Sequence, residues 1–103
     1  MAGFVTVGES TSVVEGEVTG FMVGALQLAA TRLDGVVHAF ADVCTHRKCN
    51  FSMGCDLEGA ELTCECHGAV FDLRTGEVLA PPATEPLPVY PAREVDGQVQ
   101  IEV

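Results

Sequence analysis

Short apolar segments separated by turn residues make up most of the chain. Apolar and polar residues alternate in QVQIEV (residues 98–103), which is the pattern of a strand with one buried face. The segments FVTV (4–7) and VVHAFA (36–41) are also strongly apolar. Asp-Gly pairs at 34–35 and 96–97 stand between apolar segments, and glycine there supplies the positive φ of a tight hairpin turn. The pattern therefore predicts short antiparallel strands joined by hairpins.

The segment from residue 21 to residue 33 is the least regular part of this pattern. ALQLAATRL (25–33) fits either a helical turn or a strand, but its position directly before an Asp-Gly hairpin favours a strand. No segment combines a sustained helical period with caps at both ends. The expected fold class is therefore a small all-β domain.

The middle of the chain differs from its flanks. Its apolar segments ELTC (61–64) and AVFDL (69–73) lead into a turn at 74–76 and a proline-rich segment, APPATEPLP (80–88). All five cysteines also lie in the middle of the chain, at Cys44, Cys49, Cys55, Cys64 and Cys66. We therefore expect a loop-rich insertion that carries the cysteines.

Length, charge and cysteine content restrict the function classes. With 103 residues, of which 48% are hydrophobic, the chain can form one domain with its own core, spanning residues 1–103. A formal net charge of -10 argues against nucleic acid and anionic membrane surfaces as partners and favours a basic protein surface. The N-terminus lacks the features of a signal peptide, and no apolar run approaches the roughly 18 residues that span a bilayer, so we expect a soluble cytoplasmic protein. Cysteines in a reducing compartment are more often metal ligands or redox groups than parts of a disulfide framework.

Two short segments combine a thiol with an imidazole. Cys44 precedes His46 by two positions, and Cys64 precedes His67 by three. Two cysteines and two histidines fit either a tetrahedral zinc site or an iron–sulfur cluster in which histidines replace two cysteines on one iron. Structural zinc sites usually pair like ligands in each half, whereas each segment here supplies one ligand of each kind, which suits two metals held side by side. A zinc-binding structural module and a thiol–disulfide role for Cys64 and Cys66 remain as alternatives.

Together the two segments carry the pattern C-x-H followed by C-x-x-H, which resembles the signature of the Rieske iron–sulfur family. The segment 68–103 is also similar to the C-terminal half of the Rieske ferredoxins that serve ring-hydroxylating oxygenases. The resemblance implies the Rieske iron–sulfur fold, a small antiparallel β-sandwich or barrel with an inserted, loop-rich cluster-binding subdomain at about residues 42–83. It also implies one 2Fe-2S cluster with two cysteine and two histidine ligands. The ligands would be Cys44 and Cys64 on the buried iron and His46 and His67 on the outer iron.

Two substitutions near the second segment bear on the reduction potential. Ala69 and Phe71 stand where high-potential Rieske proteins have a serine and a tyrosine that donate hydrogen bonds to sulfur. Without these donors, negative charge on the sulfurs is less stabilised. The resemblance therefore implies a potential in the lower half of the range of the class.

The remaining cysteines and the prolines also have counterparts in the family. Cys49 and Cys66 match the positions of a disulfide that links the two ligand segments of high-potential Rieske proteins, and we prefer this disulfide to two free thiols. The segment with Pro81 and Pro82 resembles the proline loop that covers the third side of the cluster. Cys55 is left over and is expected to be a small buried hydrophobic residue.

The resemblance implies an electron carrier, not an enzyme. We expect a soluble, monomeric ferredoxin that passes single electrons from a flavin reductase to a terminal oxygenase, without nucleic acid or membrane partners. The alternative is an electron-transfer subunit of a fixed oxidoreductase complex of the quinol- or arsenite-oxidising type. Two groups of charged residues fit either partner docking or plain solvation. They are the cations Arg47 and Lys48 and the acidic residues Asp56, Glu58, Glu61 and Glu65.

Overall fold

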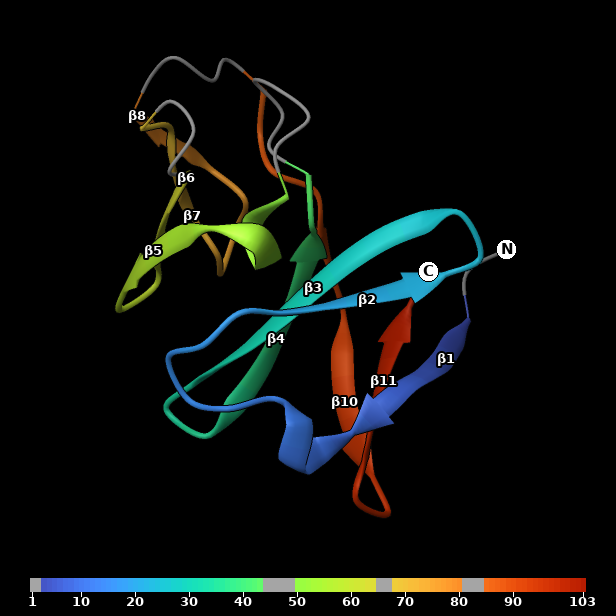
Figure 1. Cartoon of the computed structure of the whole chain (residues 1–103). Coiled ribbons are helices and arrows are strands. Elements are labelled where there is room, and N and C mark those ends of the chain that lie inside the picture. Colours follow the sequence, from blue (N-terminus) through green and yellow to red (C-terminus); the bar gives the residue numbers. More distant parts are fainter. Residues whose placement is uncertain (1–2, 44–49, 65–67, 81–84) are drawn as a thin grey trace.

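Strands account for almost all of the regular structure in the computed structural model, which describes residues 3–43, 50–64, 68–80 and 85–103. In these segments the chain forms three antiparallel sheets (Figure 1), which confirms the all-β prediction. The sheets have the strand orders β1-β11-β10, β2-β3-β4-β9 and β5-β6-β7-β8. No helix in these segments has the length and apolar character that crossing a bilayer requires.

The strands are β1 (Phe4–Glu9), β2 (Thr19–Val23), β3 (Leu26–Leu33), β4 (Val36–Ala41), β5 (Cys55–Glu58), β6 (Glu61–Cys64), β7 (Val70–Asp72), β8 (Val78–Ala80), β9 (Val89–Tyr90), β10 (Ala92–Val95) and β11 (Gln98–Glu102). Two short 3-10 helices, η1 (Ser10–Ser12) and η2 (Phe51–Met53), join them.

Both Asp-Gly hairpins are confirmed. Asp34 and Gly35 between β3 and β4 have φ values of 51° and 81°, and Asp96 and Gly97 between β10 and β11 have φ values of 52° and 76°. Positive φ at both central residues is the backbone of the primed turn that matches the twist of a two-residue hairpin.

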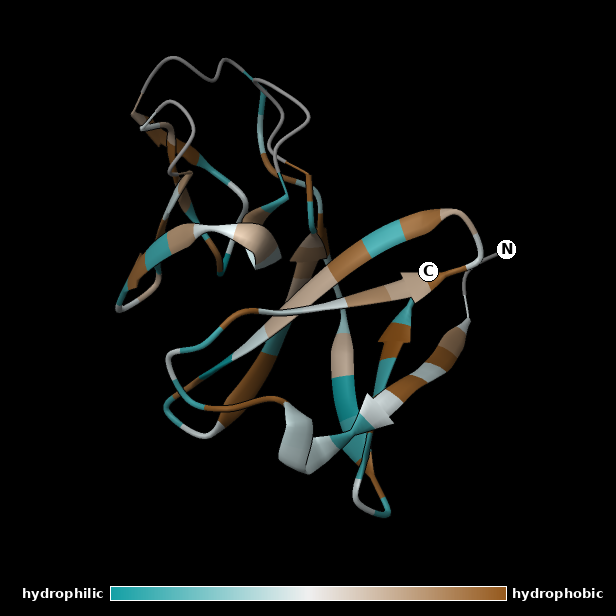
Figure 2. Ribbon diagram, viewed as in Figure 1, coloured by the Kyte–Doolittle hydropathy of each residue, from teal (hydrophilic) through white to brown (hydrophobic). Residues whose placement is uncertain are grey.

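The ambiguous segment from residue 21 to residue 33 contains strand and no helical turn. It holds the end of β2 and all of β3, with Gly24 at a φ of 62° in the turn between them. The irregular hydrophobic pattern of β3 has a physical reason: Leu28, Ala29 and Ala30 are consecutive and all fully buried, so both faces of the strand are covered. Figure 2 shows hydrophobic residues along both β3 and β4.

The sheet β2-β3-β4-β9 is the shared wall of two cores. On one face, Leu28 and Ala30 of β3 belong to a buried cluster with Val99 and Ile101 of β11. This cluster closes the sandwich formed with the sheet β1-β11-β10. Because alternate residues of a strand point to opposite faces, the neighbouring Ala29 contributes to the other core.

The second core joins the shared wall to the sheet β5-β6-β7-β8. Phe40 of β4 packs there with Phe51, Leu62 and Phe71, all of them almost completely buried. The insertion that carries the cysteines is therefore built around its own antiparallel sheet. The strands β5 and β8 of this sheet, four and three residues long, were not predicted from the sequence.

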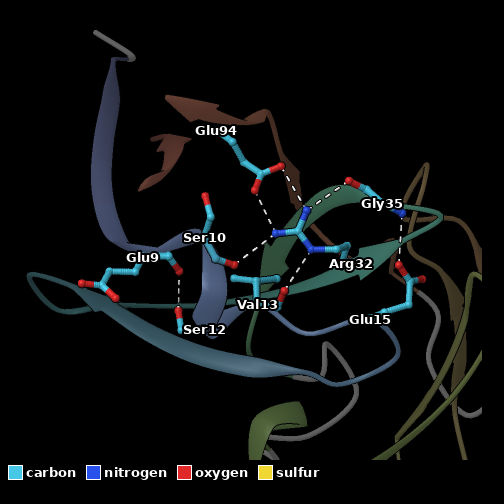
Figure 3. Close-up of polar contacts among 8 residues, drawn as sticks. All are labelled: Glu9, Ser10, Ser12, Val13, Glu15, Arg32, Gly35 and Glu94. Carbon is cyan, nitrogen blue, oxygen red and sulfur yellow. Dashed lines mark hydrogen bonds and ion pairs between the residues drawn. The ribbon is translucent and has the colours of Figure 1, made fainter. Parts of the chain in front are cut away.

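Arg32 of β3 ties the two sheets of the sandwich together through all five of its N–H groups (Figure 3). Its guanidinium donates to both carboxylate oxygens of Glu94 on β10, at 2.8 and 3.1 Å. It also donates to the carbonyl oxygens of Ser10, Val13 and Gly35, at 3.0 to 3.1 Å. These contacts hold the pKa of Glu94 below its ordinary value, chiefly through the hydrogen bonds from Arg32, and raise the pKa of Arg32.

Candidate metal centre

One of the four predicted cluster ligands lies in the described part of the chain. Cys64 is the last residue of β6 and is 1% exposed. The other three ligands, Cys44, His46 and His67, lie outside the described residues. The other predictions that lie outside them concern Cys49 and Cys66, Pro81 and Pro82, Arg47 and Lys48, and Glu65.

The two ends of the second ligand segment, Cys64 at the end of β6 and Gly68 before β7, are held together by backbone hydrogen bonds. The backbone N–H of Cys64 donates to the carbonyl oxygen of Ala69, and the N–H of Gly68 donates to the carbonyl oxygen of Cys64, both at 2.8 Å. Gly68 has a φ of 79°, a conformation that favours glycine. Cys64 is therefore fixed at the end of β6, inside the second core.

The ends of the first ligand segment are also held together. Val43 and Asn50, on either side of residues 44–49, form an antiparallel bridge. The N–H of Phe51 donates to the carbonyl oxygen of Asp42 at 2.9 Å. The chain therefore enters and leaves this six-residue segment at one place, beside β3 and β4.

Backbone hydrogen bonds also fix the C-terminal end of the proline-rich segment (80–88) against the turn at 74–76. The N–H of Leu87 donates to the carbonyl oxygen of Gly76 at 2.8 Å, and the N–H of Gly76 donates to the carbonyl oxygen of Asp72 at 2.7 Å. A Cβ at position 76 would lie 2.1 Å from the Leu87 carbonyl oxygen, so only glycine fits this approach. Arg74 stabilises the same turn and holds the pKa of Asp72 below its ordinary value, mainly through side-chain and then backbone hydrogen bonds.

The residues that border these three segments pack in one hydrophobic core. Phe51, which follows the first ligand segment, contacts Phe71 of β7 edge to face, with ring centroids 5.9 Å apart and an interplanar angle of 88°. Cys64, Ala69 and Leu87 belong to the same buried cluster. The structure therefore brings together the described residues that border the two ligand segments and the proline-rich segment.

The residues that border the ligand segments fit a Rieske cluster. A thiolate as buried as Cys64 is costly unless a cation compensates its charge, and metal ligation supplies that compensation. Ala69 and Phe71 are both fully buried beside Cys64 and carry no hydroxyl group. Within the described segments, no group of three or more His, Cys, Asp or Glu side chains could hold a metal ion elsewhere.

Cys55 lies next to this site. It is directly opposite Cys64 in the register of β5 and β6, and it is partly buried against the second core. His38, the remaining histidine of the chain, lies on β4 opposite Thr31. It is separate in sequence from both ligand segments.

Asp42 is a buried polar residue beside the first ligand segment that the sequence did not single out. It follows β4 and is 4% exposed, and its carboxylate accepts hydrogen bonds from Asn50 and Ser52. The available signal was an acidic residue directly after the apolar strand VVHAFA and two positions before Cys44. That signal alone does not distinguish a buried carboxylate from one at a solvated strand end.

The chain matches known proteins of one family over most of its length. A family model described as the Rieske [2Fe-2S] domain matches residues 3–91. The ferredoxin component of the naphthalene 1,2-dioxygenase system of Pseudomonas putida is 33% identical over 93 residues, which are 90% of this chain and 88% of that protein. The ferredoxin subunit of the anthranilate 1,2-dioxygenase of Burkholderia cepacia is 36% identical over 89 residues, which are 86% of this chain and 82% of that protein.

Solved structures agree with the sequence matches. The Sphingomonas yanoikuyae B1 ferredoxin superposes with a TM-score of 0.90 at 29% identity, covering 98% of this chain and 99% of that one. A chain from the complex of reduced oxygenase and oxidized ferredoxin in carbazole 1,9a-dioxygenase superposes with a TM-score of 0.85 at 30% identity, covering 95% of this chain and 91% of that one. The chain therefore belongs to the Rieske [2Fe-2S] domain family.

Proposed function

We propose that this protein is a ferredoxin that carries single electrons from a flavin reductase to a terminal oxygenase in the cytoplasm. The observation that carries the proposal is the match to ferredoxin components of aromatic dioxygenase systems along nearly the whole length of both chains. The structural relatives include a ferredoxin in complex with its oxygenase. The protein is a carrier without a catalytic site of its own.

In this proposal Cys44, His46, Cys64 and His67 hold one 2Fe-2S cluster, within a cluster-binding subdomain of residues 42–83. When bound, such a cluster supplies a site that accepts and releases one electron, at a potential set by its ligands and their surroundings. The buried position of Cys64 supports its assignment to the inner iron. The histidines are assigned to the outer iron.

The described residues around Cys64 would exclude water and set the potential. Phe51, Leu62 and Phe71 are each 1% exposed or less and surround Cys64 with apolar groups. The side chains of Ala69 and Phe71 offer no hydrogen bond to sulfur. Both features disfavour extra negative charge on the sulfurs, so we place the potential in the lower half of the range of the class.

A further part of the proposal is a disulfide between Cys49 and Cys66. We assign these residues to a disulfide between the two ligand segments, as in high-potential Rieske proteins. That pattern also favours the second candidate function, an electron-transfer subunit of a fixed quinol- or arsenite-oxidising complex. Counting free thiols in the denatured protein with and without reductant tests the disulfide, and a high reduction potential would favour the second candidate.

The decisive experiment is a joint analysis of metal, sulfide and spectrum on the purified protein. We expect iron and acid-labile sulfide in equal amounts, and the EPR spectrum of a Rieske cluster after reduction. Cys64→Ser should abolish the visible absorption, whereas Cys55→Ser, at the neighbouring position on β5, should retain it. Zinc without acid-labile sulfide would overturn the proposal.

A further inference from the structure

We infer that Asp42 is a positioning residue that fixes the first ligand segment against the rest of the protein. The inference rests on the proposed function, since it takes residues 44–49 to carry two cluster ligands. It concerns residues on both sides of this segment, namely Asp42 and Val43 before it and Asn50 and Ser52 after it.

The carboxylate of Asp42 reaches across to the chain that leaves the segment. Its Oδ1 accepts the backbone N–H of Ser52 at 2.8 Å. Its Oδ2 accepts the Ser52 hydroxyl at 2.5 Å and the Asn50 side-chain amide at 3.2 Å. One side chain at the entry of the segment therefore holds two residues at its exit.

The backbone of Asp42 joins the same residues to the central sheet. Its N–H donates to the carbonyl oxygen of Gln27 on β3 at 3.1 Å, and its carbonyl oxygen accepts the N–H of Phe51 at 2.9 Å. The side chain of Asn50 also donates to the side-chain oxygen of Gln27. Asp42 therefore connects β3, the entry and the exit of the ligand segment in one hydrogen-bonded network.

The composition of this network points to a role beyond ordinary stability. Asp42 is 4% exposed, and the hydrogen-bond donors that reach its carboxylate in the described part of the chain are neutral groups. Burying a carboxyl group among neutral donors costs free energy, and well-packed apolar residues are often as stable at such positions. Such a group is justified where it selects a single geometry, and a short segment with two metal ligands requires one.

Gly20 of β2 leaves the space that the network occupies. A Cβ at position 20 would lie 2.7 Å from the Ser52 hydroxyl oxygen and 3.1 Å from Asp42 Oδ2. Contacts that short force the Ser52 or Asp42 side chain to move. Gly20→Ala is therefore a second way to disturb the network without removing any of its polar groups.

The test compares holoprotein variants by the stability and spectrum of the cluster. Asp42→Ala removes all three acceptor contacts, and Ser52→Ala removes only the hydroxyl donor. We expect Asp42→Ala to lose visible cluster absorption at least about tenfold faster than the wild type in the presence of a chelator, since a tenfold change corresponds to the net contribution of a single hydrogen bond and this variant loses three. The rates of cluster loss in Ser52→Ala and Gly20→Ala should lie between those of the wild type and Asp42→Ala. The EPR spectrum and the reduction potential should shift in the same order, because the ligand geometry is less uniform.

A control variant separates positioning from general stability. Glu94→Gln weakens the contacts of Arg32 on β3 with Glu94 on β10, which share no residue with the Asp42 network. It should lower the stability of the protein to urea and leave the EPR spectrum and potential unchanged. If Asp42→Ala folds poorly, Ser52→Ala and Gly20→Ala still test the order of effects.

Two outcomes are distinguishable. If the wild type contains no iron and sulfide, the proposed function fails. If the wild type carries a cluster but the variants at Asp42, Ser52 and Gly20 keep its potential, spectrum and lifetime, the inference about Asp42 is overturned.

Discussion

At the scale of single residues, Ala69 is the clearest point at which this chain can tune its potential. It is fully buried, and its carbonyl oxygen accepts the N–H of Cys64 at 2.8 Å. We expect Ala69→Ser to place a hydroxyl donor beside the ligand sulfur and to stabilise the reduced state. A hydrogen bond of about 1 kcal/mol corresponds to an increase of about 40 mV for a one-electron couple.

A redox titration followed by visible absorption or EPR measures this change. The matched control is Ala30→Ser, which adds a hydroxyl at an equally buried alanine in the other core. The control should leave the potential unchanged. An Ala69→Ser protein with the wild-type potential would mean that a hydroxyl here does not reach the sulfur.

At the scale of secondary-structure elements, the Arg32–Glu94 pair makes the sandwich sensitive to acid. Because the pKa of Glu94 in the folded protein lies below its ordinary value, the stabilisation is fully present above about pH 4.5, the ordinary glutamate pKa. It is lost as the pH falls below that value and through the lowered pKa. Urea unfolding at pH 7 and pH 3 measures the loss.

The variant Glu94→Gln isolates this contribution. It should be less stable than the wild type at pH 7, and the difference in unfolding free energy should narrow at pH 3, where Glu94 of the unfolded wild-type chain binds a proton. Asp72 also has a lowered pKa, so the variant should keep some acid sensitivity of its own. A gap of the same size at both pH values would show that the charge of Glu94 does not contribute.

The elements also show what could and could not be predicted from the sequence. The two hairpins were predictable because Asp-Gly at 34–35 and 96–97 has local turn chemistry that decides the backbone. The split of residues 21–33 between β2 and β3 was not, because burial of β3 on both faces removes the alternation on which strand prediction depends. The strand β5 escaped prediction because it has only four residues and gains its stability from pairing with β6.

The candidate site also includes one residue that the sequence singled out and one that it did not. Cys64 was predicted as a ligand from residue type and spacing, because metal ligation restricts the residue types directly, and its role stays a prediction. Asp42 was missed, because its importance depends on contacts with Asn50 and Ser52 that form only in the fold. A pattern of predicted ligands can be read from residue spacing in the sequence. A residue proposed to position them is found only from its contacts in the folded structure.

At the scale of the whole molecule, the net charge of -10 should govern encounters with partner proteins. The β5–β6 hairpin, whose opposite end holds Cys64, carries part of this charge at its turn. Glu58 and Glu61 are exposed and directly opposite each other in its register, and Asp56 is exposed on the same hairpin. Like charges in directly opposite positions destabilise a hairpin, so this arrangement is unfavourable in the free protein, and we expect a basic partner surface to relieve it.

We therefore expect the double variant Glu58→Gln/Glu61→Gln to be slightly more stable than the wild type but slower to accept electrons from the reductase component of a ring-hydroxylating dioxygenase system. Stopped-flow reduction at increasing salt measures the effect. The wild-type rate should fall about tenfold between low and high ionic strength, as screening shortens the Debye length from about 30 Å to about 3 Å, and the variant should respond less. Glu9→Gln/Glu102→Gln removes the same charge from β1 and β11, and this control should keep most of the wild-type rate. If both double variants slow the reaction equally, net charge alone steers the encounter and the hairpin has no special part in it.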